Sequence, residues 1–232
     1  MPNLVWVVFL AGAMGSATAG DAAASSCVKL ILPDDLDGLA CRVTAAGPVA
    51  GSVGALRFQI QEYVDDGAVM GAGVAVFTAT SGDAARPVAE AVASDARFDA
   101  PVQFRNEVGV FLDLNAETHG TGQFPLGRLF IQRDGSWAPV DIDSWQQELA
   151  KRLPAGMQVW RGPFPDYPDF AASAVVRRDG GGSLENDEGY AAVLLRFRDG
   201  KLTIDNASWQ IGIDGPCAVM PDYPHCNDKG AH

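Results

Sequence analysis

The sequence predicts an α+β fold made predominantly of antiparallel β hairpins, with two short helices at about 83–94 and 144–153. Three observations lead to this fold class. Several segments alternate apolar and polar residues with period two, which is typical of half-buried strands. Two Asp-Gly pairs separate such segments, and this dipeptide is a strong signal for a two-residue hairpin. Only two segments carry the apolar spacing of a helix.

The first half of the chain contains three expected strands and one expected helix. Residues 53–63 and 107–114 alternate between apolar and polar, and residues 73–78 are almost entirely apolar. Such a short apolar run is typical of a strand that is covered on both faces. Ser81-Gly82-Asp83 offers a turn and a helix cap, so the apolar spacing that follows predicts the helix at 83–94.

Two hairpins are expected in the second half, and each has an Asp-Gly turn. One joins 129–133 to 136–142, and the other joins 191–198 to 201–204. Both turns are followed by Ser-Trp-Gln and, further on, by Pro-Asp-Tyr-Pro. Segments 133–168 and 198–224 are therefore candidates for two degenerate copies of one unit. Chance recurrence of common turn residues is the alternative.

The helix at 144–153 carries the clearest helical signal. Ser144 and Gln147 form a capping-box pattern at its start. An apolar stripe that would face the core runs along one side of it, and its members are Ile142, Trp145, Leu149 and Leu153.

The remaining segments are short or irregular. Residues 157–160 and 174–178 are expected to be short strands. The Pro-rich segment 162–169 is expected to be a loop, because proline cannot donate a hydrogen bond to a strand ladder. Residues 180–183 are expected to form a flexible connection, and the tail from Gly215 onward is expected to be irregular.

The N-terminus has the pattern of a secretory signal peptide. The first twenty residues carry no charged side chain, and an apolar segment is followed by Ala17-Thr18-Ala19, an A-x-A cleavage pattern. We therefore expect a signal peptide at 1–19 and a single mature α+β unit at 20–232, with a soft boundary near 154–169. An uncleaved N-terminal anchor is the alternative. Export would place the protein in the periplasm or outside the cell.

Composition and charge restrict the function classes. The chain is 47% hydrophobic and 20% charged, which excludes a disordered chain. Its formal net charge of −12 would repel phosphate backbones and anionic lipid. We therefore expect no nucleic-acid partner, and no membrane association after signal cleavage.

Four cysteines lie near the two ends of the mature chain. In an oxidising compartment they are expected to form the local disulfides Cys27–Cys41 and Cys217–Cys226, although three pairings are open. Zinc coordination is the alternative, but no C-x-x-C spacing is present.

One segment has residues suited to metal binding or acid/base chemistry. If the strand at 107–114 continues, Asp113, Asn115, Glu117 and His119 project from the same face. Oxygen ligands suit Ca²⁺, and a His with carboxylates suits Zn²⁺, so Asp113, Glu117 and His119 are the candidate metal ligands. Glu117 and His119 are also candidates for a general acid/base pair. A solvated strand face is the alternative, and no cofactor is expected in that case.

Aromatic residues around the Pro-rich segment suggest a binding surface. Exposed aromatic rings beside Pro and Asp suit a peptide or a glycan, and the candidates are Trp160, Phe164, Tyr167 and Tyr223. The alternative is that these rings cover the core where regular structure is missing.

The sequence contains no strong catalytic motif. It lacks G-x-S-x-G, H-E-x-x-H and a P-loop, and Gly71-Ala72-Gly73 precedes its expected strand instead of following it. The prediction is an exported, acidic envelope or secreted protein that binds a protein, peptide or glycan without catalysis. The alternative is a divalent-cation-dependent hydrolase that uses Asp113, Glu117 and His119.

Overall fold

The computed structural model describes residues 26–79, 86–118, 127–179, 188–213, 215–224 and 226. The predicted signal peptide at 1–19 and the predicted connection at 180–183 lie outside the described residues. The described chain is mostly antiparallel β-sheet and has two short helices. This arrangement confirms a β-rich fold.

The first sheet has four antiparallel strands in the order β1-β2-β3-β4. They are β1 (Ala40–Pro48), β2 (Leu56–Asp65), β3 (Ala68–Thr78) and β4 (Ala89–Ser94). The strands predicted at 53–63 and 73–78 are therefore present as β2 and β3.

The helix predicted at 83–94 is wrong, because residues 89–94 form β4. Ala89, Ala91 and Ala93 are buried and alternate with half-buried residues, which is a period of two. Periodicity cannot separate a strand from a helix over so few residues. Here pairing with β3, which runs from Gly71 opposite Ser94 to Val76 opposite Ala89, decides the structure.

The central sheet has the strand order β10-β9-β7-β6. Strands β5 and β8 form a separate two-stranded sheet. The central strands are β6 (Val102–Arg105), β7 (Val110–Leu114), β9 (Arg128–Arg133) and β10 (Ser136–Val140). The small sheet pairs β5 (Ala96–Phe98) with β8 (Ala116–Thr118).

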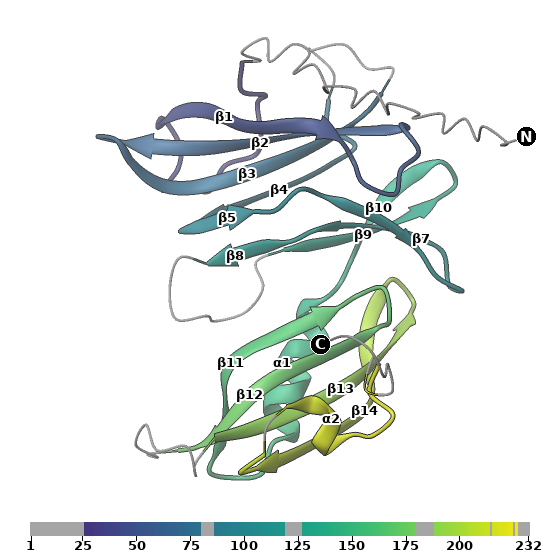
Figure 1. The fold of residues 1–232 in the computed structure, drawn as a ribbon. Helices are drawn as coiled ribbons and strands as arrows, with labels where there is room; N and C mark the ends of the chain where they lie inside the picture. The colour runs from purple at the N-terminus through teal and green to yellow at the C-terminus, as the bar shows by residue number, and fades with distance from the viewer. Residues whose placement is uncertain are drawn as a thin grey trace, which may run out of the picture.

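The third sheet has the order β11-β12-β13-β14 and carries both helices. Its strands are β11 (Met157–Asp166), β12 (Ala171–Arg178), β13 (Glu188–Arg198) and β14 (Lys201–Ile211). The helices are α1 (Asp143–Arg152) and α2 (Pro216–Val219). Figure 1 shows α1 behind this sheet and α2 in front of it.

Both predicted Asp-Gly hairpins are confirmed. Asp134 and Gly135 have φ values of 49° and 78°, and Asp199 and Gly200 have 52° and 80°. Positive φ at both central residues is the geometry of the type I′ turn, whose twist matches that of the flanking strands.

The predicted helix at 144–153 is confirmed as α1, but its cap differs from the prediction. No capping hydrogen bond comes from the Ser144 side chain. The Oδ1 atom of Asp141 accepts hydrogen bonds of 3.1 Å from the backbone N–H groups of both Asp143 and Ser144. Asp141 therefore satisfies N–H groups that the first helical turn leaves unpaired.

The loop predicted at 162–169 is wrong for most of its length, because β11 continues to Asp166. Its pairing with β12 shifts register between Val159 and Arg161, and again between Arg161 and Phe164. The peptide bond between Gly162 and Pro163 is cis. Edge strands and bulges tolerate proline, and β11 is both bulged and at an edge. The turn that does form is at 167–170.

The three sheets stack as layers (Figure 1). One buried cluster lies between the first sheet and the central sheet, and a second lies between the central sheet, α1 and the third sheet. Along β7, Leu112 belongs to the first cluster and Phe111 to the second, so the central sheet is buried on both faces. Phe111 makes edge-to-face contacts with Phe170 and Phe197, at 5.4 and 5.7 Å between ring centroids.

The segment before β1 covers the outer face of the first sheet. The Val28 backbone N–H donates to Gln59 Oε1 and Gln61 Oε1, and Gln61 Nε2 donates to the Val28 carbonyl, each at 3.1 Å. Leu30 lies over Gly73, where a Cβ atom would be 2.7 Å from Leu30 Cδ1. The predicted Cys27–Cys41 disulfide is present and ties this segment to β1.

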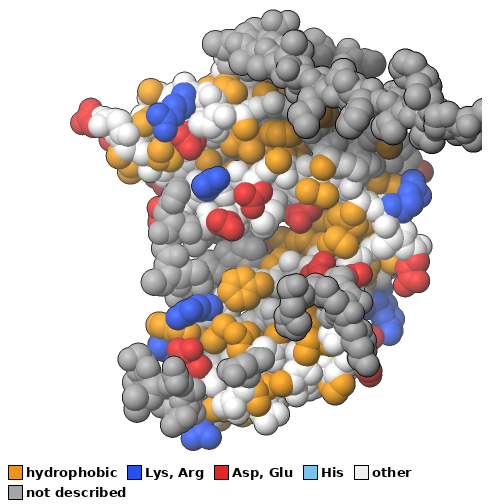
Figure 2. Space-filling model, in the orientation of Figure 1, with side chains coloured by type: hydrophobic (Ala, Val, Ile, Leu, Met, Phe, Trp, Pro, Cys, Tyr) orange, Lys and Arg blue, Asp and Glu red, His pale blue; other side chains and the backbone are white. Residues whose placement is uncertain are grey.

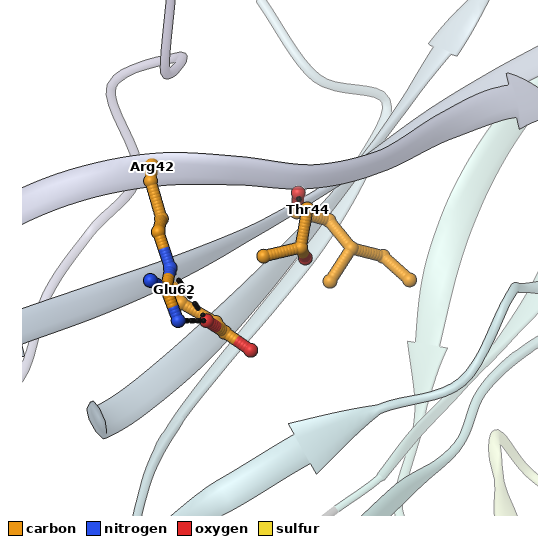
Figure 3. Close-up of polar contacts among 4 residues, drawn as sticks. Arg42, Thr44 and Glu62 are labelled. Atoms are coloured by element: carbon orange, nitrogen blue, oxygen red, sulfur yellow. Dashed lines mark hydrogen bonds and ion pairs between the residues drawn. The ribbon is translucent and has the colours of Figure 1, made fainter. Parts of the chain in front are cut away.

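Strand β1 forms an edge of the first sheet, and its exposed side is held by polar contacts with β2 (Figure 3). The Arg42 guanidinium bonds Glu62 Oε2 through two nitrogen atoms, at 2.9 and 2.7 Å. Thr44 lies at a register shift and donates a 3.4 Å hydrogen bond to the Ile60 carbonyl. A bulged, charged edge of this kind disfavours pairing with another chain.

Candidate functional site

Three of the four predicted binding aromatics share the outer face of the third sheet. Phe164 pairs directly with Ser173 across β11 and β12, so their side chains lie on the same face. The Tyr223 hydroxyl shares a hydrogen bond with the Ser173 side chain. Trp160 stacks on Arg177, which points away from the buried cluster that contains Val176. We call Trp160, Phe164 and Tyr223 the aromatic face.

Trp160 is held against a cationic side chain. The Arg177 guanidinium carbon lies 3.2 Å from the centroid of the Trp160 ring. The buried Nε atom of Arg177 has no hydrogen-bond partner among the described residues. Attraction between the guanidinium and the π face of the Trp160 indole therefore offsets part of its loss of hydration. This stacking fixes the orientation of a half-buried tryptophan.

Phe164 and Tyr223 lie together beside Ser173 at one end of the aromatic face. Phe164 is 54% exposed, which is unusual for so large an apolar side chain. Burial raises the pKa of Tyr223, the hydrogen bond with Ser173 lowers it, and the negative charges of Asp166 and Asp169 raise it further. These two carboxylates therefore lie near the Tyr223 ring.

The C-terminal segment contributes to this face through a covalent link. Tyr223 lies between the two cysteines of the predicted Cys217–Cys226 disulfide, which is present. The preceding helix α2 packs against β13 and β14. Figure 2 shows hydrophobic side chains interspersed with acidic and basic ones over the third sheet.

Tyr167 is separate from the aromatic face. Its side chain is only 4% exposed and belongs to the cluster between the central and third sheets. Its hydroxyl has no hydrogen-bond partner within the described part of the chain. The pKa of Tyr167 is raised, first by burial and then by the negative charges of Asp113 and Asp143.

Asp113, the first candidate metal ligand, lies in this same buried region. It pairs with Leu129 on β9 and so faces the third sheet. Burial, together with the charge of Asp99, raises its pKa from 3.8 to about 7. Its Oδ1 atom has no hydrogen-bond partner among the residues described.

The strand that was expected to align Asp113 with Glu117 and His119 is not continuous. Strand β7 ends at Leu114, and Glu117 lies on β8, which pairs with β5 in a different sheet. Glu117 is exposed, whereas Asp113 is largely buried. Between them, Asn115 donates a 3.3 Å hydrogen bond to Asp99. His119 lies outside the described residues.

No candidate metal centre emerges from the part of the chain that the structure describes. There, no three His, Cys, Asp or Glu side chains lie close enough together to hold a metal ion. The predicted Ca²⁺ or Zn²⁺ site at Asp113, Glu117 and His119 stays a prediction, because His119 is not described.

A cavity of about 470 Å³ lies where the core between the first and central sheets opens to solvent. Its wall includes Gln103, Gln132 and Trp137, whose partners in the sheet place them on the side that faces β1–β4. The sequence analysis missed this cavity, because no spacing rule connects residues on β2, β3, β6, β9 and β10. The only local signal was Trp137 two residues after an Asp-Gly turn.

Comparison of the chain with protein-family models, with curated proteins and with solved structures gives no match. None of the helices among the described residues has the length and apolar character needed to cross a membrane.

Proposed function

We propose that the protein is an exported, non-catalytic binding protein whose aromatic face docks a basic segment of a protein or peptide partner. The observation that carries this proposal is that Trp160, Phe164 and Tyr223 lie on the same face of the third sheet. They come from two places in the chain that are about sixty residues apart. The two disulfides and the acidic composition are compatible with an exported protein.

The chemistry of the aromatic face supports a protein or peptide partner. Tryptophan, tyrosine and arginine are the residues that most often dominate binding energy at protein interfaces. The Trp160–Arg177 stack and the hydrogen-bonded Tyr223 are preorganised, so little side-chain freedom is lost on binding. Phe164 offers an exposed apolar contact beside them.

The charges at the Tyr223 end of this face favour a basic partner. Asp166 and Asp169 lie near Tyr223, and the whole chain has a formal net charge of −12. Complementary charge raises association rates and disfavours acidic partners. The bulges and prolines of β11 disfavour strand addition at this edge, so the partner would dock on the face of the sheet.

Binding can be tested with a pool of short Lys- and Arg-rich peptides, and with a matched acidic pool, by fluorescence anisotropy. We expect binding of the basic pool, weakened by salt and reduced at least about tenfold by Phe164→Ala. Ile31→Ala is the matched control, because Ile31 is 81% exposed and lies before β1. Absence of binding, or equal losses in both variants, would overturn the proposal.

The second candidate is the divalent-cation-dependent hydrolase, and one observation favours it. Asp113 has a pKa of about 7, which suits a general acid or base at neutral pH. The hydrolase function requires the side chains of Glu117 and His119 to lie close to that of Asp113. Native mass spectrometry of the mature protein before and after EDTA tests this candidate: a retained metal supports it, and a metal-free mass contradicts it.

A further inference from the structure

The cavity at Trp137 has a preformed wall. It is lined by Ala55, Leu56, Thr78, Val88, Gln103, Gln132, Gly135, Ser136 and Trp137. Backbone hydrogen bonds hold these segments in place: Ala79 donates to Ala55 at 3.0 Å, Val88 to Val76 at 2.7 Å, and Gln103 to Ala50 at 2.8 Å. The hairpin turn on its rim is closed by a 2.9 Å bond from Ser136 Oγ to the Arg133 carbonyl. These bonds fix the positions of the described segments that line the cavity.

The cavity lies at one end of the interface between the first and central sheets. It lies at the end of the first two sheets' shared core, where Leu56 is the first residue of β2 and Thr78 the last of β3. The central sheet continues past that point with Gln132 and Trp137, which pair across β9 and β10.

The lining is neutral but polar. Among the described residues that line the cavity, none has an acidic, basic or imidazole side chain. Gln103 and Gln132 each bring an amide that both donates and accepts hydrogen bonds, and Ser136 brings a hydroxyl. Leu56, Val88 and the flat indole of Trp137 supply the apolar surface.

We propose that this cavity binds a small uncharged polyhydroxylated ring, that is, a neutral saccharide unit. Hydroxyl groups on such a ring match the mixed donors and acceptors of two amides. Its C–H face offers a flat apolar surface that fits against Trp137. The volume of about 470 Å³ falls within the range of small-molecule sites.

Other ligand chemistries fit this lining less well. From the described residues of the wall, a charged ligand would gain no opposite charge to offset the hydration that it loses. Anions are disfavoured further by the net charge of −12. A purely apolar ligand would bury the glutamine amides without hydrogen bonds, which costs free energy for each unpaired group.

This site is independent of the aromatic face. The cavity opens between the first and central sheets, whereas Trp160, Phe164 and Tyr223 lie on the far side of the third sheet. A failure of peptide binding at Phe164 therefore leaves the saccharide proposal untouched, and the reverse also holds.

The test is isothermal titration calorimetry of the mature protein with glucose, N-acetylglucosamine and maltose, and with glucuronate and glucosamine as charged counterparts. We expect saturable binding of at least one neutral sugar and at least about tenfold weaker binding of both charged probes. Gln132→Ala should weaken neutral-sugar binding by roughly tenfold without unfolding the protein, because Gln132 is exposed. Ile31→Ala is the control and should leave the affinity unchanged, because Ile31 is 81% exposed and does not line the cavity.

Two further readouts connect the effect to this cavity. The Trp137 indole N–H signal in a two-dimensional NMR spectrum should shift on titration, while that of fully buried Trp145 should not. Trp137→Phe keeps a ring against the core and should retain weakened binding. No saturable response to any neutral sugar, preferential binding of a charged probe, or an unchanged affinity in Gln132→Ala would overturn the proposal.

Discussion

Asp113 should make the stability of this protein depend on pH in an unusual direction. In the unfolded chain this carboxyl group releases its proton near pH 3.8, whereas in the folded protein it does so near pH 7. Between these values the folded state holds a proton that the unfolded state has lost. The free energy of unfolding should therefore be highest below pH 3.8, fall as the pH rises, and level off above pH 7, as far as Asp113 is concerned.

The size of this effect follows from the change in pKa. Each tenfold change in proton affinity corresponds to about 1.4 kcal/mol, so the rise from 3.8 to about 7 corresponds to ~4 kcal/mol. The physical origin is burial of a carboxylate between the central and third sheets, where Oδ1 lacks a hydrogen-bond partner among the described residues. Such a penalty is large beside the ~5–15 kcal/mol of total stability typical of a domain.

Chemical denaturation of the wild type and Asp113→Asn, measured from pH 4 to pH 8, provides the assay. The asparagine variant cannot ionise at this position, so it should lack the fall between pH 4 and pH 7. At pH 8 it should be the more stable protein. Asp99→Asn is the matched control and should keep the fall, displaced slightly to lower pH, because Asp99 raises the pKa of Asp113. Parallel profiles for the wild type and Asp113→Asn would refute the reasoning.

Three further substitutions test individual contacts by denaturation at fixed pH. Gly71→Ala should destabilise the protein by about 1–3 kcal/mol, since its methyl group would lie 2.7 Å from the backbone carbonyl oxygen of Ala93; an unchanged midpoint would contradict this packing. Gln61→Ala should cost about 1–3 kcal/mol, because it leaves the Val28 backbone with weakened pairing, and faster hydrogen exchange at Val28 should accompany the loss. Tyr167→Phe should be neutral or stabilising by up to ~1 kcal/mol, because it removes a buried hydroxyl that has no described partner; a loss above ~1 kcal/mol would show that the hydroxyl is bonded.

Structure that depends on neighbours in the chain was predictable. The two Asp-Gly turns and α1 rest on backbone conformations that a few adjacent residues determine. The disulfides Cys27–Cys41 and Cys217–Cys226 are also local, with separations of 14 and 9 residues. Strand β4 and the second half of β11 were not predictable in this way. Each is held as a strand by its pairing with a neighbouring strand, which overrides its local tendency.

The candidate sites were also predictable only where they depend on residues close together in the chain. The aromatic residues in and around the Pro-Asp-Tyr-Pro segments suggested a binding surface that includes Trp160, Phe164 and Tyr223. The contacts of Phe164 and Tyr223 with Ser173 are what place these two rings on one face. The same local pattern gave no sign that Tyr167 turns into the core. The prediction that one strand continues past Leu114 and aligns Asp113 with Glu117 was also wrong. The chain leaves the central sheet at that point and enters another sheet.

By itself, the sequence determined the β-rich class, the hairpin turns, the helix at Ser144 and the excess of negative charge. Each of these depends on composition or on residues within a few positions of one another. Tertiary structure alone decided that three sheets stack, with the central layer buried on both faces, and that Asp113 and Tyr167 lie near each other between two of these sheets. It also decided that a cavity whose described lining residues are uncharged opens beside Trp137. Contacts between strands far apart in the chain decide these features, and side-chain burial follows from which layers pack together.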